Sequence, residues 1–343
     1  MGQGGVTIKD IAKVVGKSPA AVSKALRGHQ DIAPETRRMI QQMAQEMGYK
    51  ANVAARRLQK QRTETLGLVL PVLSARQADP LLTELLSGIA DCATTHGFDL
   101  LVSTCAPGPQ EENIYRRLAD QGRVDGFIIV QPRRDDWRID FLDQQKTPYT
   151  TIGNTNSAST LSSVWVDINS GVKQIIAHLI QQGRQNIALI LPPPGLLLAE
   201  AYLQAFKAAI ALHPKIAGQL SIETRDLSQK EGQRATLALL DGADMPDAII
   251  AGHDLVALGA MAAAQGQGFE IGSDIAMVGF GDILLAEYSQ PPLTTLHQPT
   301  YNMGQQACQM LLKIIAGQTL PPPSIVIEPW LVIRQSSGLD LWV

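Results

Sequence analysis

The sequence has few of the features that mark secreted, membrane or metal-binding proteins. Its 343 residues include three cysteines, Cys92, Cys105 and Cys308, whose odd number and wide spacing fit neither a disulfide framework nor a zinc cluster. No run approaches the roughly 18 apolar residues of a membrane-spanning helix. The first residues, Met-Gly-Gln-Gly-Gly, lead into a polar helical pattern without an apolar signal segment. We therefore expect a cytoplasmic protein without membrane association, whose cysteines are structural.

Residue clusters that indicate catalysis are also missing from the sequence. The six histidines are scattered, without the His-x3-His or His-Glu-x-x-His spacing of metal sites. No Gly-x4-Gly-Lys phosphate loop and no Gly-x-Ser-x-Gly nucleophile turn occurs. The charged run between Arg133 and Arg138 is interpreted as a solvated loop. We expect no catalytic residue, no cofactor and no metal.

Charge is distributed unevenly along the chain. Up to Thr65, twelve Lys and Arg stand against five Asp and Glu, whereas the rest of the chain has 17 against 27. The net charge of −3 therefore hides a basic head on an acidic body. Because neutralisation of phosphates by Lys and Arg supplies most sequence-independent affinity for DNA, this head is expected to meet a polyanion. The alternative is an ordinary solvated basic surface.

The basic head begins with two short helices joined by a tight turn. Thr7 can cap a helix with apolar residues at helical spacing, and Gly16 ends it. Ser18 can cap a second helix that begins at Pro19, where the missing N–H of proline costs nothing. This arrangement is typical of a helix-turn-helix, in which the second helix enters the major groove of DNA.

Two more helices are expected in the head, over residues 34–47 and, after Asn52, over residues 53–59. The alternative to a DNA-binding motif is a small helical bundle with an incidental glycine turn.

From Thr65 onward, short apolar runs alternate with amphipathic helices, a pattern typical of βα units and parallel sheets. The runs are continuously apolar, as expected for strands covered on both faces. They are Leu66 to Leu70, Leu100 to Ser103, Phe127 to Val130, Ile187 to Leu191, Ala248 to Ala251 and Ile275 to Val278. Helices are expected near 80–95, 110–121, 170–182, 198–212, 229–240 and 254–265. The number of units is sufficient for two doubly wound sheets.

The segment from Val6 to Gly28, Val-Thr-Ile-Lys-Asp-Ile-Ala-Lys-Val-Val-Gly-Lys-Ser-Pro-Ala-Ala-Val-Ser-Lys-Ala-Leu-Arg-Gly, closely resembles the N-terminus of the lactose-repressor (LacI/GalR) family. Further family landmarks follow in order along the whole chain. They are Thr36-Arg37, Gly48-Tyr49, Asn52 with Ala54-Ala55 and Leu58, Val124-Asp125-Gly126, Ala257-Leu258-Gly259-Ala260-Met261, Val278-Gly279-Phe280, Pro291-Pro292-Leu293-Thr294-Thr295 and Ile333-Arg334-Gln335-Ser336-Ser337-Gly338.

The resemblance implies a small all-α helix-turn-helix head plus an α/β two-lobed sensor domain like the periplasmic sugar-binding proteins. The head would span residues 1–50, the hinge helix and linker 51–64, and the sensor 65–343. One lobe would hold about 65–163 and 298–326, the other about 164–296 and 327–343, with crossovers near 163, 297 and 326.

The resemblance also implies what the parts do. The protein would be a transcriptional regulator, most commonly a repressor, that binds a palindromic double-stranded DNA operator. It would act as a homodimer, since the family's C-terminal tetramerising helix has no counterpart. A small-molecule effector between the lobes would change the spacing of the two heads.

Base recognition is expected mainly from the start of the second helix. Pro19 and Ala20 have no side-chain donor and can offer only apolar contacts, for example to a thymine methyl, so Lys24 is the main directional donor. By the resemblance, Leu58 inserts into the minor groove at the centre of the palindrome. The predicted DNA-binding residues are Thr7, Ser18, Pro19, Ala20, Ser23, Lys24, Arg27, Thr36, Asn52, Ala55 and Leu58.

The expected effector cleft departs from the family pattern. Sugar-binding members place an arginine and several acidic or amide groups there, because a polyhydroxyl ligand must replace its hydrogen bonds to water. In this chain Tyr202 stands at the usual arginine position, and Gly153 and Gly281 stand at two usual acidic positions. Leu81 and Leu82 replace a usual pair of aromatic residues, and Leu227 stands where an aromatic ring often stacks on the ligand. The predicted effector-binding residues are Leu81, Leu82, Val130, Gly153, Asn154, Tyr202, Leu227, His253, Asp254, Gly281 and Gln298.

These exchanges remove polar and stacking groups, so we expect an effector that is more apolar or more unusual than a free sugar. Two alternatives stay open: an idle cleft with regulation by other means, or a sugar bound through Asn154, Tyr202 and His253. Two rival functions share the architecture. A solute-binding protein would need an export signal and no basic head, and an enzyme would need the catalytic cluster that is missing.

Overall fold

The structure is a computed structural model that describes residues 6–26, 28, 30–49, 62–72, 79–155, 162–214, 216, 221–318 and 324–338. The chain divides into two compact units, residues 1–62 and residues 63–343.

The first unit contains α1 (Ile8–Val15), α2 (Pro19–Leu26) and α3 (Pro34–Glu46). Thr7 caps α1 in a capping box with Asp10, and Gly16 ends the helix with a φ of 67°, which glycine adopts without strain. The three predicted helices are thus confirmed; the fourth, over 53–59, lies outside the described residues. The core of this unit consists of Ile11, Ala12, Val22, Ala25, Ile40 and Ala44.

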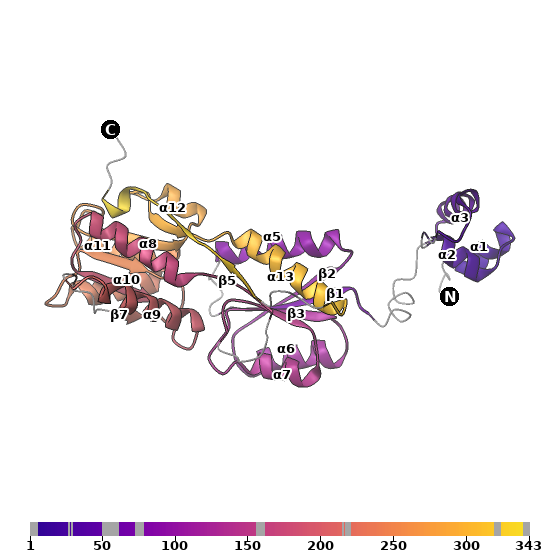
Figure 1. Cartoon of the computed structure of the whole chain (residues 1–343), viewed down its shortest axis with the longest axis horizontal. Helices are drawn as coiled ribbons and strands as arrows, with labels where there is room; N and C mark the ends of the chain where they lie inside the picture. The colour runs from indigo at the N-terminus through magenta and orange to yellow at the C-terminus, as the bar shows by residue number, and fades with distance from the viewer. Residues whose placement is uncertain are drawn as a thin grey trace. The chain divides into compact units, whose positions relative to one another are not determined.

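The second unit contains two six-stranded sheets (Figure 1). The strand orders are β11-β5-β4-β3-β1-β2 and β12-β10-β9-β8-β6-β7, and all neighbouring strands are parallel except β12, which is antiparallel to β10. The strands are β1 (Thr65–Pro71), β2 (Asp99–Cys105), β3 (Gly126–Val130), β4 (Tyr149–Ile152), β5 (Ser163–Val166), β6 (Ile187–Leu191), β7 (Ser221–Glu223), β8 (Ala248–Ala251), β9 (Ala276–Gly281), β10 (Thr294–His297), β11 (Ser324–Ile327) and β12 (Trp330–Val332). The six predicted strands are all present. However, β2 is half exposed because it forms the edge of its sheet, so the prediction that both of its faces are covered was wrong.

Helices cover both faces of each sheet. They are α5 (Pro80–Thr95), α6 (Pro109–Asp120), α7 (Trp137–Gln145), α8 (Ile168–Gln181), α9 (Leu197–Ala211), α10 (Gln229–Leu240), α11 (Asp254–Gly266), α12 (Leu284–Tyr288) and α13 (Thr300–Ile315). In the first lobe, α5 and α13 lie on one face and α6 and α7 on the other (Figure 1). Successive residues of a strand point to opposite faces of the sheet, so Leu68 of β1 packs on the side of α5 and α13, and Val69 packs on the side of α6 and α7.

The two helices α5 and α13 approach closely because each presents a glycine to the other. A Cβ atom on Gly88 would lie 2.0 Å from the carbonyl oxygen of Tyr301, and one on Gly304 would lie 2.4 Å from that of Leu85. The second lobe repeats this device, since a Cβ on Gly232 of α10 would lie 2.0 Å from a carbonyl oxygen of α11.

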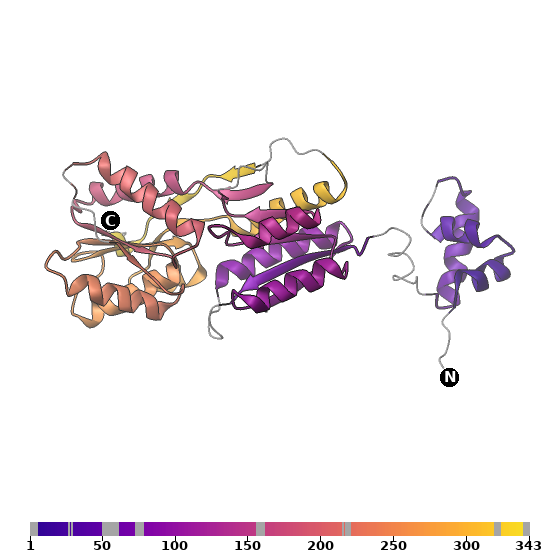
Figure 2. The same ribbon diagram turned by 90° about the horizontal axis from the view of Figure 1, so that it is seen from below.

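The chain passes between the two sheets three times, between β5 and α8, between β10 and α13, and between β11 and β12. In Figure 2 the yellow segment near the C-terminus runs from one lobe to the other. The sequence placed the first and third crossings near 163 and 326. Because β5 pairs with β11 through Val166 and Ile327, these crossings follow residues 166 and 327.

The charged run at 133–138 is not the solvated loop that the sequence suggested. Arg138 and Glu111 have no exposed surface, and Asp136 is buried as well. Arg138 Nε donates to Asp136 at 2.7 Å, and the Arg133 guanidinium donates to both oxygens of Glu111, at 2.7 and 2.8 Å. Burial alone would raise the pKa of Asp136, but the hydrogen bonds from Arg138 hold it below its ordinary value. Because Glu111 lies 22 residues before Arg133, no local sequence pattern predicts that these charged side chains are buried together.

Candidate functional site

The start of α2 presents an exposed surface in the first unit. Pro19, Ala20 and Lys24 are exposed, whereas Val22 and Ala25 are buried in the core. Because the apolar face of α2 points inward, the opposite face is free to meet a ligand as large as a DNA duplex.

Lys24 has a partner within the head. Its Nζ lies 2.6 Å from Asp31 Oδ2, and both side chains are about half exposed, at 48% and 53%. Exposed ion pairs contribute little net stability, so Lys24 can exchange this carboxylate for another acceptor at low cost.

The other predicted DNA-binding residues fall into three groups. Ser18 Oγ accepts from the Ala21 N–H at 3.2 Å, and Thr7 Oγ1 accepts from the Asp10 N–H at 3.4 Å, so both hydroxyls serve as helix caps. Ser23 and Thr36 are partly exposed. Arg27, Asn52, Ala55 and Leu58 lie outside the described residues.

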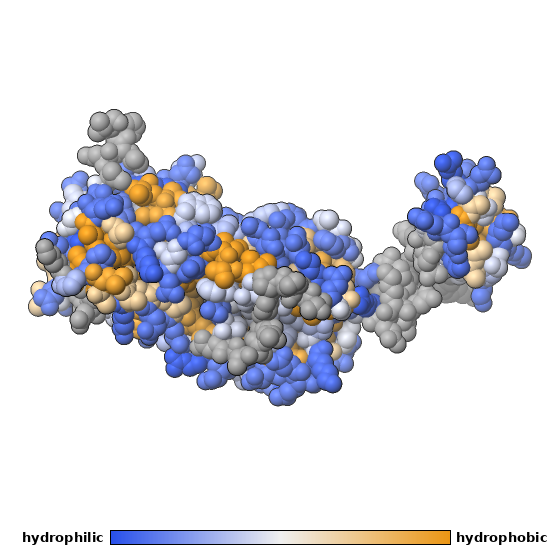
Figure 3. Space-filling view, viewed as in Figure 1, coloured by the Kyte–Doolittle hydropathy of each residue, from blue (hydrophilic) through white to orange (hydrophobic). Residues whose placement is uncertain are grey.

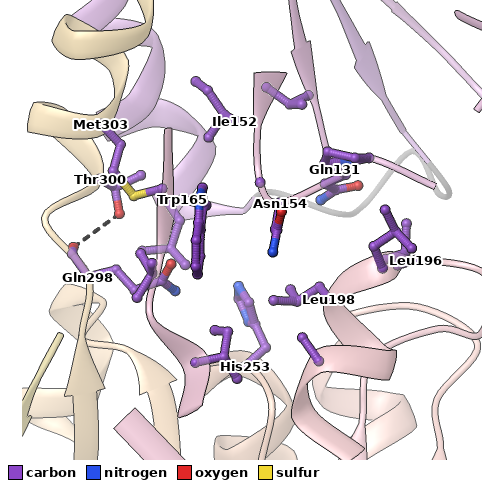
Figure 4. Close-up of a pocket in the computed structure, with 18 of the residues that line it drawn as sticks. Gln131, Ile152, Asn154, Trp165, Leu196, Leu198, His253, Gln298, Thr300 and Met303 are labelled. Atoms are coloured by element: carbon purple, nitrogen blue, oxygen red, sulfur yellow. Dashed lines mark hydrogen bonds between the residues drawn. The ribbon is translucent and has the colours of Figure 1, made fainter. Parts of the chain in front are cut away.

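A cavity of about 250 Å³ lies between the two lobes of the second unit (Figure 4). It sits beyond the carboxyl ends of parallel strands in both sheets, where open α/β folds bind their ligands. Eight predicted effector-binding residues line it: Leu81, Leu82, Val130, Gly153, Asn154, Leu227, His253 and Gln298. Its walls are mostly apolar.

His253 provides a buried donor to this cavity. Its Nδ1 accepts from the Leu255 N–H at 3.2 Å, so in the neutral ring Nε2 carries the proton. Nε2 lies 3.3 Å from Asp79 Oδ1 in the other lobe, but the alignment is not that of a hydrogen bond, and Nε2 has no hydrogen-bond partner among the described residues. The ring is 5% exposed, and Figure 4 shows it directed into the cavity.

Two predicted cleft residues lie behind the wall. Tyr202 is fully buried, with its ring edge-on to Phe280 at a centroid distance of 5.0 Å. Asp254 accepts hydrogen bonds from Thr295 Oγ1 at 2.6 Å and from the Ile283 N–H at 2.8 Å. Burial raises the pKa of Asp254. Both side chains support the second lobe from inside.

The third, Gly281, forms part of a contact between the lobes. A Cβ atom there would lie 2.9 Å from Leu81 Cδ1. Leu81 belongs to the first lobe, yet it packs into the apolar cluster of α10 and α11 in the second. An aspartate at position 281 would require Leu81 to shift and would have to adopt a φ of 132°, which L side chains rarely adopt, so glycine fits here.

A second contact between the lobes closes another side of the cavity. The Arg134 N–H donates to Gly195 O at 3.0 Å, and the Leu197 N–H donates to Pro132 O at 3.1 Å. Arg134 Nη2 also lies 2.7 Å from Glu200 Oε1. We call these three interactions the rim latch. Pro132 and Leu197 line the cavity as well, so the latch and the cavity wall share residues.

Trp165 is the most informative lining residue that the sequence analysis missed. It lies on β5 between Val164 and Val166, which are buried in the core, so its ring projects from the opposite face of the strand. A bulky aromatic between two buried valines was the available signal. The other missed lining residues are Asp79, Leu85, Gln131, Pro132, Ile152, Val166, Ile168, Asn169, Leu196, Leu197, Leu198, Ala201, Gly252, Thr300 and Met303.

Other kinds of site find no support in the part of the chain that the structure describes. No three His, Cys, Asp or Glu side chains there come together as a metal site. None of the described helices has the length and apolar character needed to cross a membrane.

Known proteins resemble both units. Residues 7–52 match bacterial regulatory proteins of the lacI family, and residues 176–337 match the periplasmic binding protein-like domain. The HTH-type transcriptional regulator CelR of Thermobifida fusca is 30% identical over 96% of this chain and 98% of the relative. The HTH-type transcriptional repressor CytR of Escherichia coli K12 is 28% identical over 96% of each.

Solved structures agree with these relatives. A complex of CelR with cellobiose matches with a TM-score of 0.75 at 28% identity, over 96% of this chain and 99% of that one. A lac repressor dimer bound to operator and the anti-inducer ONPF matches with a TM-score of 0.85 at 24% identity, over 98% and 100%, which supports the fold. The resemblance suggested by the sequence is therefore confirmed: the chain belongs to the lacI family of bacterial regulatory proteins and is a DNA-binding transcriptional regulator.

Proposed function

We propose that this regulator is a repressor that binds a palindromic operator as a homodimer, and that a small molecule in the interlobe cavity changes its affinity for the operator. The observation that carries this proposal is the combination, in one chain, of an exposed α2 surface with a cavity whose walls come from two lobes. A ligand that contacts both walls favours one lobe arrangement, and such a preference is what couples binding at one site to another.

The proposal also covers where and how the protein works. A repressor must reach chromosomal DNA, so it acts in the cytoplasm. Control by binding alone needs no catalytic residue, and we propose that the protein is not an enzyme. CytR, a relative of similar length, is named as a transcriptional repressor, which supports repression as the outcome.

Selection of bound fragments from random DNA by the full-length protein tests the operator part. We expect a palindromic consensus, because a twofold dimer presents two identical heads. Enrichment of a single half-site would contradict binding as a twofold dimer, and enrichment of no sequence at all would contradict binding to a specific operator.

We further propose that Leu58 anchors the operator complex. Its position lies outside the described residues, and the proposal rests on the family pattern around it. Leu58→Ala should weaken operator binding while nonspecific DNA binding stays nearly unchanged, as measured by fluorescence anisotropy at constant salt. Equal losses on both kinds of DNA would remove this role.

We also propose an effector more apolar than a common sugar. The support is a lining dominated by leucine, isoleucine and valine side chains, with Tyr202 and Asp254 behind the wall. A thermal-shift screen of monosaccharides and disaccharides tests this, and it must include cellobiose, the ligand in the CelR complex. Clear stabilisation by any of these sugars would refute the apolar preference.

A further inference from the structure

Trp165 provides the cavity with a flat apolar surface. It is the only Phe, Tyr or Trp side chain among the described lining residues, and it is partly exposed. Figure 4 shows its ring on one side of the cavity and Leu196 and Leu198 on the other. Aromatic and apolar side chains that face each other in this way favour a ligand with two flat apolar faces.

Carboxamide side chains are also directed into this space. Figure 4 shows Gln131, Asn154 and Gln298 directed toward it from different segments of the first lobe and the hinge. Asn154 Oδ1 accepts from the Thr155 N–H at 2.8 Å, which leaves the amide N–H groups for a ligand. Gln131 has a φ of 50°, and its carbonyl accepts from Arg138 Nη2 at 3.1 Å, so the buried arginine fixes its position.

The charged groups of the lining argue for an uncharged ligand. No Lys or Arg is among the described residues that line the cavity, so a phosphate or carboxylate group would be desolvated without a counter-charge. Asp79 is the one acidic residue in the described part of the lining, and its Oδ1 already accepts from the Leu81 N–H at 3.0 Å. His253 Nε2 adds a buried nitrogen that has no hydrogen-bond partner among the described residues.

The same features disfavour a sugar. A buried pyranose carries hydroxyl groups around its whole ring, and each one left unpaired costs about 1 to 3 kcal/mol. Here only a few polar side chains reach the cavity, and most of its wall is apolar. A heterocycle carries its donors and acceptors in the plane of the ring, where carboxamides can pair with them, as asparagine and glutamine pair with adenine.

We propose that the cavity binds an uncharged, flat nitrogen heterocycle, of the size of a nucleoside, that stacks on Trp165 and hydrogen-bonds at its edge to the carboxamides and to His253 Nε2. A cavity of about 250 Å³ is slightly smaller than the roughly 300 to 1,000 Å³ typical of drug-sized ligands, which suits one or two rings. This assignment rests on the proposed function, because it names the ligand of the same cavity.

Calorimetric titration of the full-length protein tests the assignment. The probes are adenosine, guanosine, cytidine, uridine and nicotinamide, with the matching 5′-monophosphates as charged counterparts and glucose and cellobiose as sugars. We expect at least one neutral heterocycle to bind and its monophosphate to bind at least tenfold more weakly. Trp165→Leu should weaken binding roughly ten- to a hundredfold, the range expected for loss of one stacked base. Trp165→Phe should retain most of the affinity.

Two controls separate stacking from loss of structure. Trp330→Leu removes a tryptophan that stacks on His297 and does not line the cavity, and it should leave ligand binding unchanged. The melting temperature of Trp165→Leu without ligand should stay near that of the wild type.

The outcomes also distinguish this inference from the proposed function. Absence of binding by every neutral heterocycle at millimolar concentration, tighter binding of a monophosphate, or binding unaffected by Trp165→Leu would each overturn the inference, while operator selection remains an independent test of the regulator. A heterocycle that binds through Trp165 but leaves operator affinity unchanged would support the ligand class and refute its role as effector.

Discussion

At the scale of single residues, we expect Lys24 to set how specifically the head reads DNA. Lys24→Ala should cost roughly 1 to 3 kcal/mol on the preferred operator and relax one base position, because Pro19 and Ala20 beside it offer no side-chain donor. Fluorescence anisotropy on the selected operator and its single-base variants measures this. Lys313→Ala, in α13 of the sensor, is the control and should change nothing. If the variant binds all DNA sequences more weakly by the same factor, Lys24 contacts only a phosphate and not a base.

The contribution of Glu231 to the stability of the fold should depend on pH. Hydrogen bonding from Arg225 lowers the pKa of this buried carboxyl to about 2. Since the ordinary pKa of Glu is about 4.3, its stabilising contribution is complete above that value and is lost as the pH falls toward 2. The melting temperature of Glu231→Gln should therefore lie below that of the wild type at pH 7, with a gap that narrows below pH 4. Glu112→Gln, in a half-exposed pair with Arg116, should show little gap. A gap constant from pH 7 to pH 3 would contradict the assignment.

At the scale of elements, the rim latch should control how easily the lobes separate. Arg134→Gln or Glu200→Gln removes a partly exposed ion pair worth up to about 1 kcal/mol, so affinity for the cavity ligand should fall by at most about fivefold. Neither side chain lines the cavity, so the effect would come from lobe closure.

Spin labels at Asn113→Cys and Lys207→Cys, one exposed site in each lobe, should report a broader distance distribution in either latch variant. Exchanging the charges, with Arg134→Glu and Glu200→Arg together, should restore the wild-type distribution. Unchanged distances in the single variants would show that the two backbone hydrogen bonds of the rim latch keep the lobes together without the ion pair.

Elements were predictable where the signal is local. The runs that became β1, β3, β6 and β8 are apolar because helices cover both faces, and the caps of α1 and α2 stand directly in the sequence. The site was less predictable where it depends on distant partners. Arg138 and Glu111 meet only in the folded lobe. Tyr202, which was expected in the cleft, is buried behind the wall, whereas Trp165, which the sequence did not single out, faces the cavity.

At the scale of the whole molecule, dimer formation should depend on the exposed face of α12. Leu284, Leu285 and Tyr288 are 70%, 49% and 71% exposed, and Figure 3 shows apolar surface over this helix. A twofold interface brings the same patch of two copies together, so one added charge is repeated on both sides. Tyr288→Glu and Leu284→Glu should each yield monomers in analytical ultracentrifugation and lower operator affinity by at least a hundredfold through loss of the second head.

Leu212→Glu is the matched control for this prediction. Leu212 is 68% exposed but lies at the end of α9, away from α12 in the sequence, and it should leave the dimer intact. Persistence of the dimer in both α12 variants would place the interface on another face.

The three crossings between the sheets also determine when each part of the chain can fold during translation. The first lobe needs α13 and β11, and the second needs β12, so the first sheet is incomplete until residue 327 has been synthesised and the second until residue 332. The head, by contrast, ends before residue 63. At about 5 to 20 residues per second, a nascent head waits roughly 15 to 55 s for its sensor. During that interval the head is a monomeric DNA-binding unit. A stop codon that removes the last tenth of the chain would leave the first sheet without β11 and the second without β12.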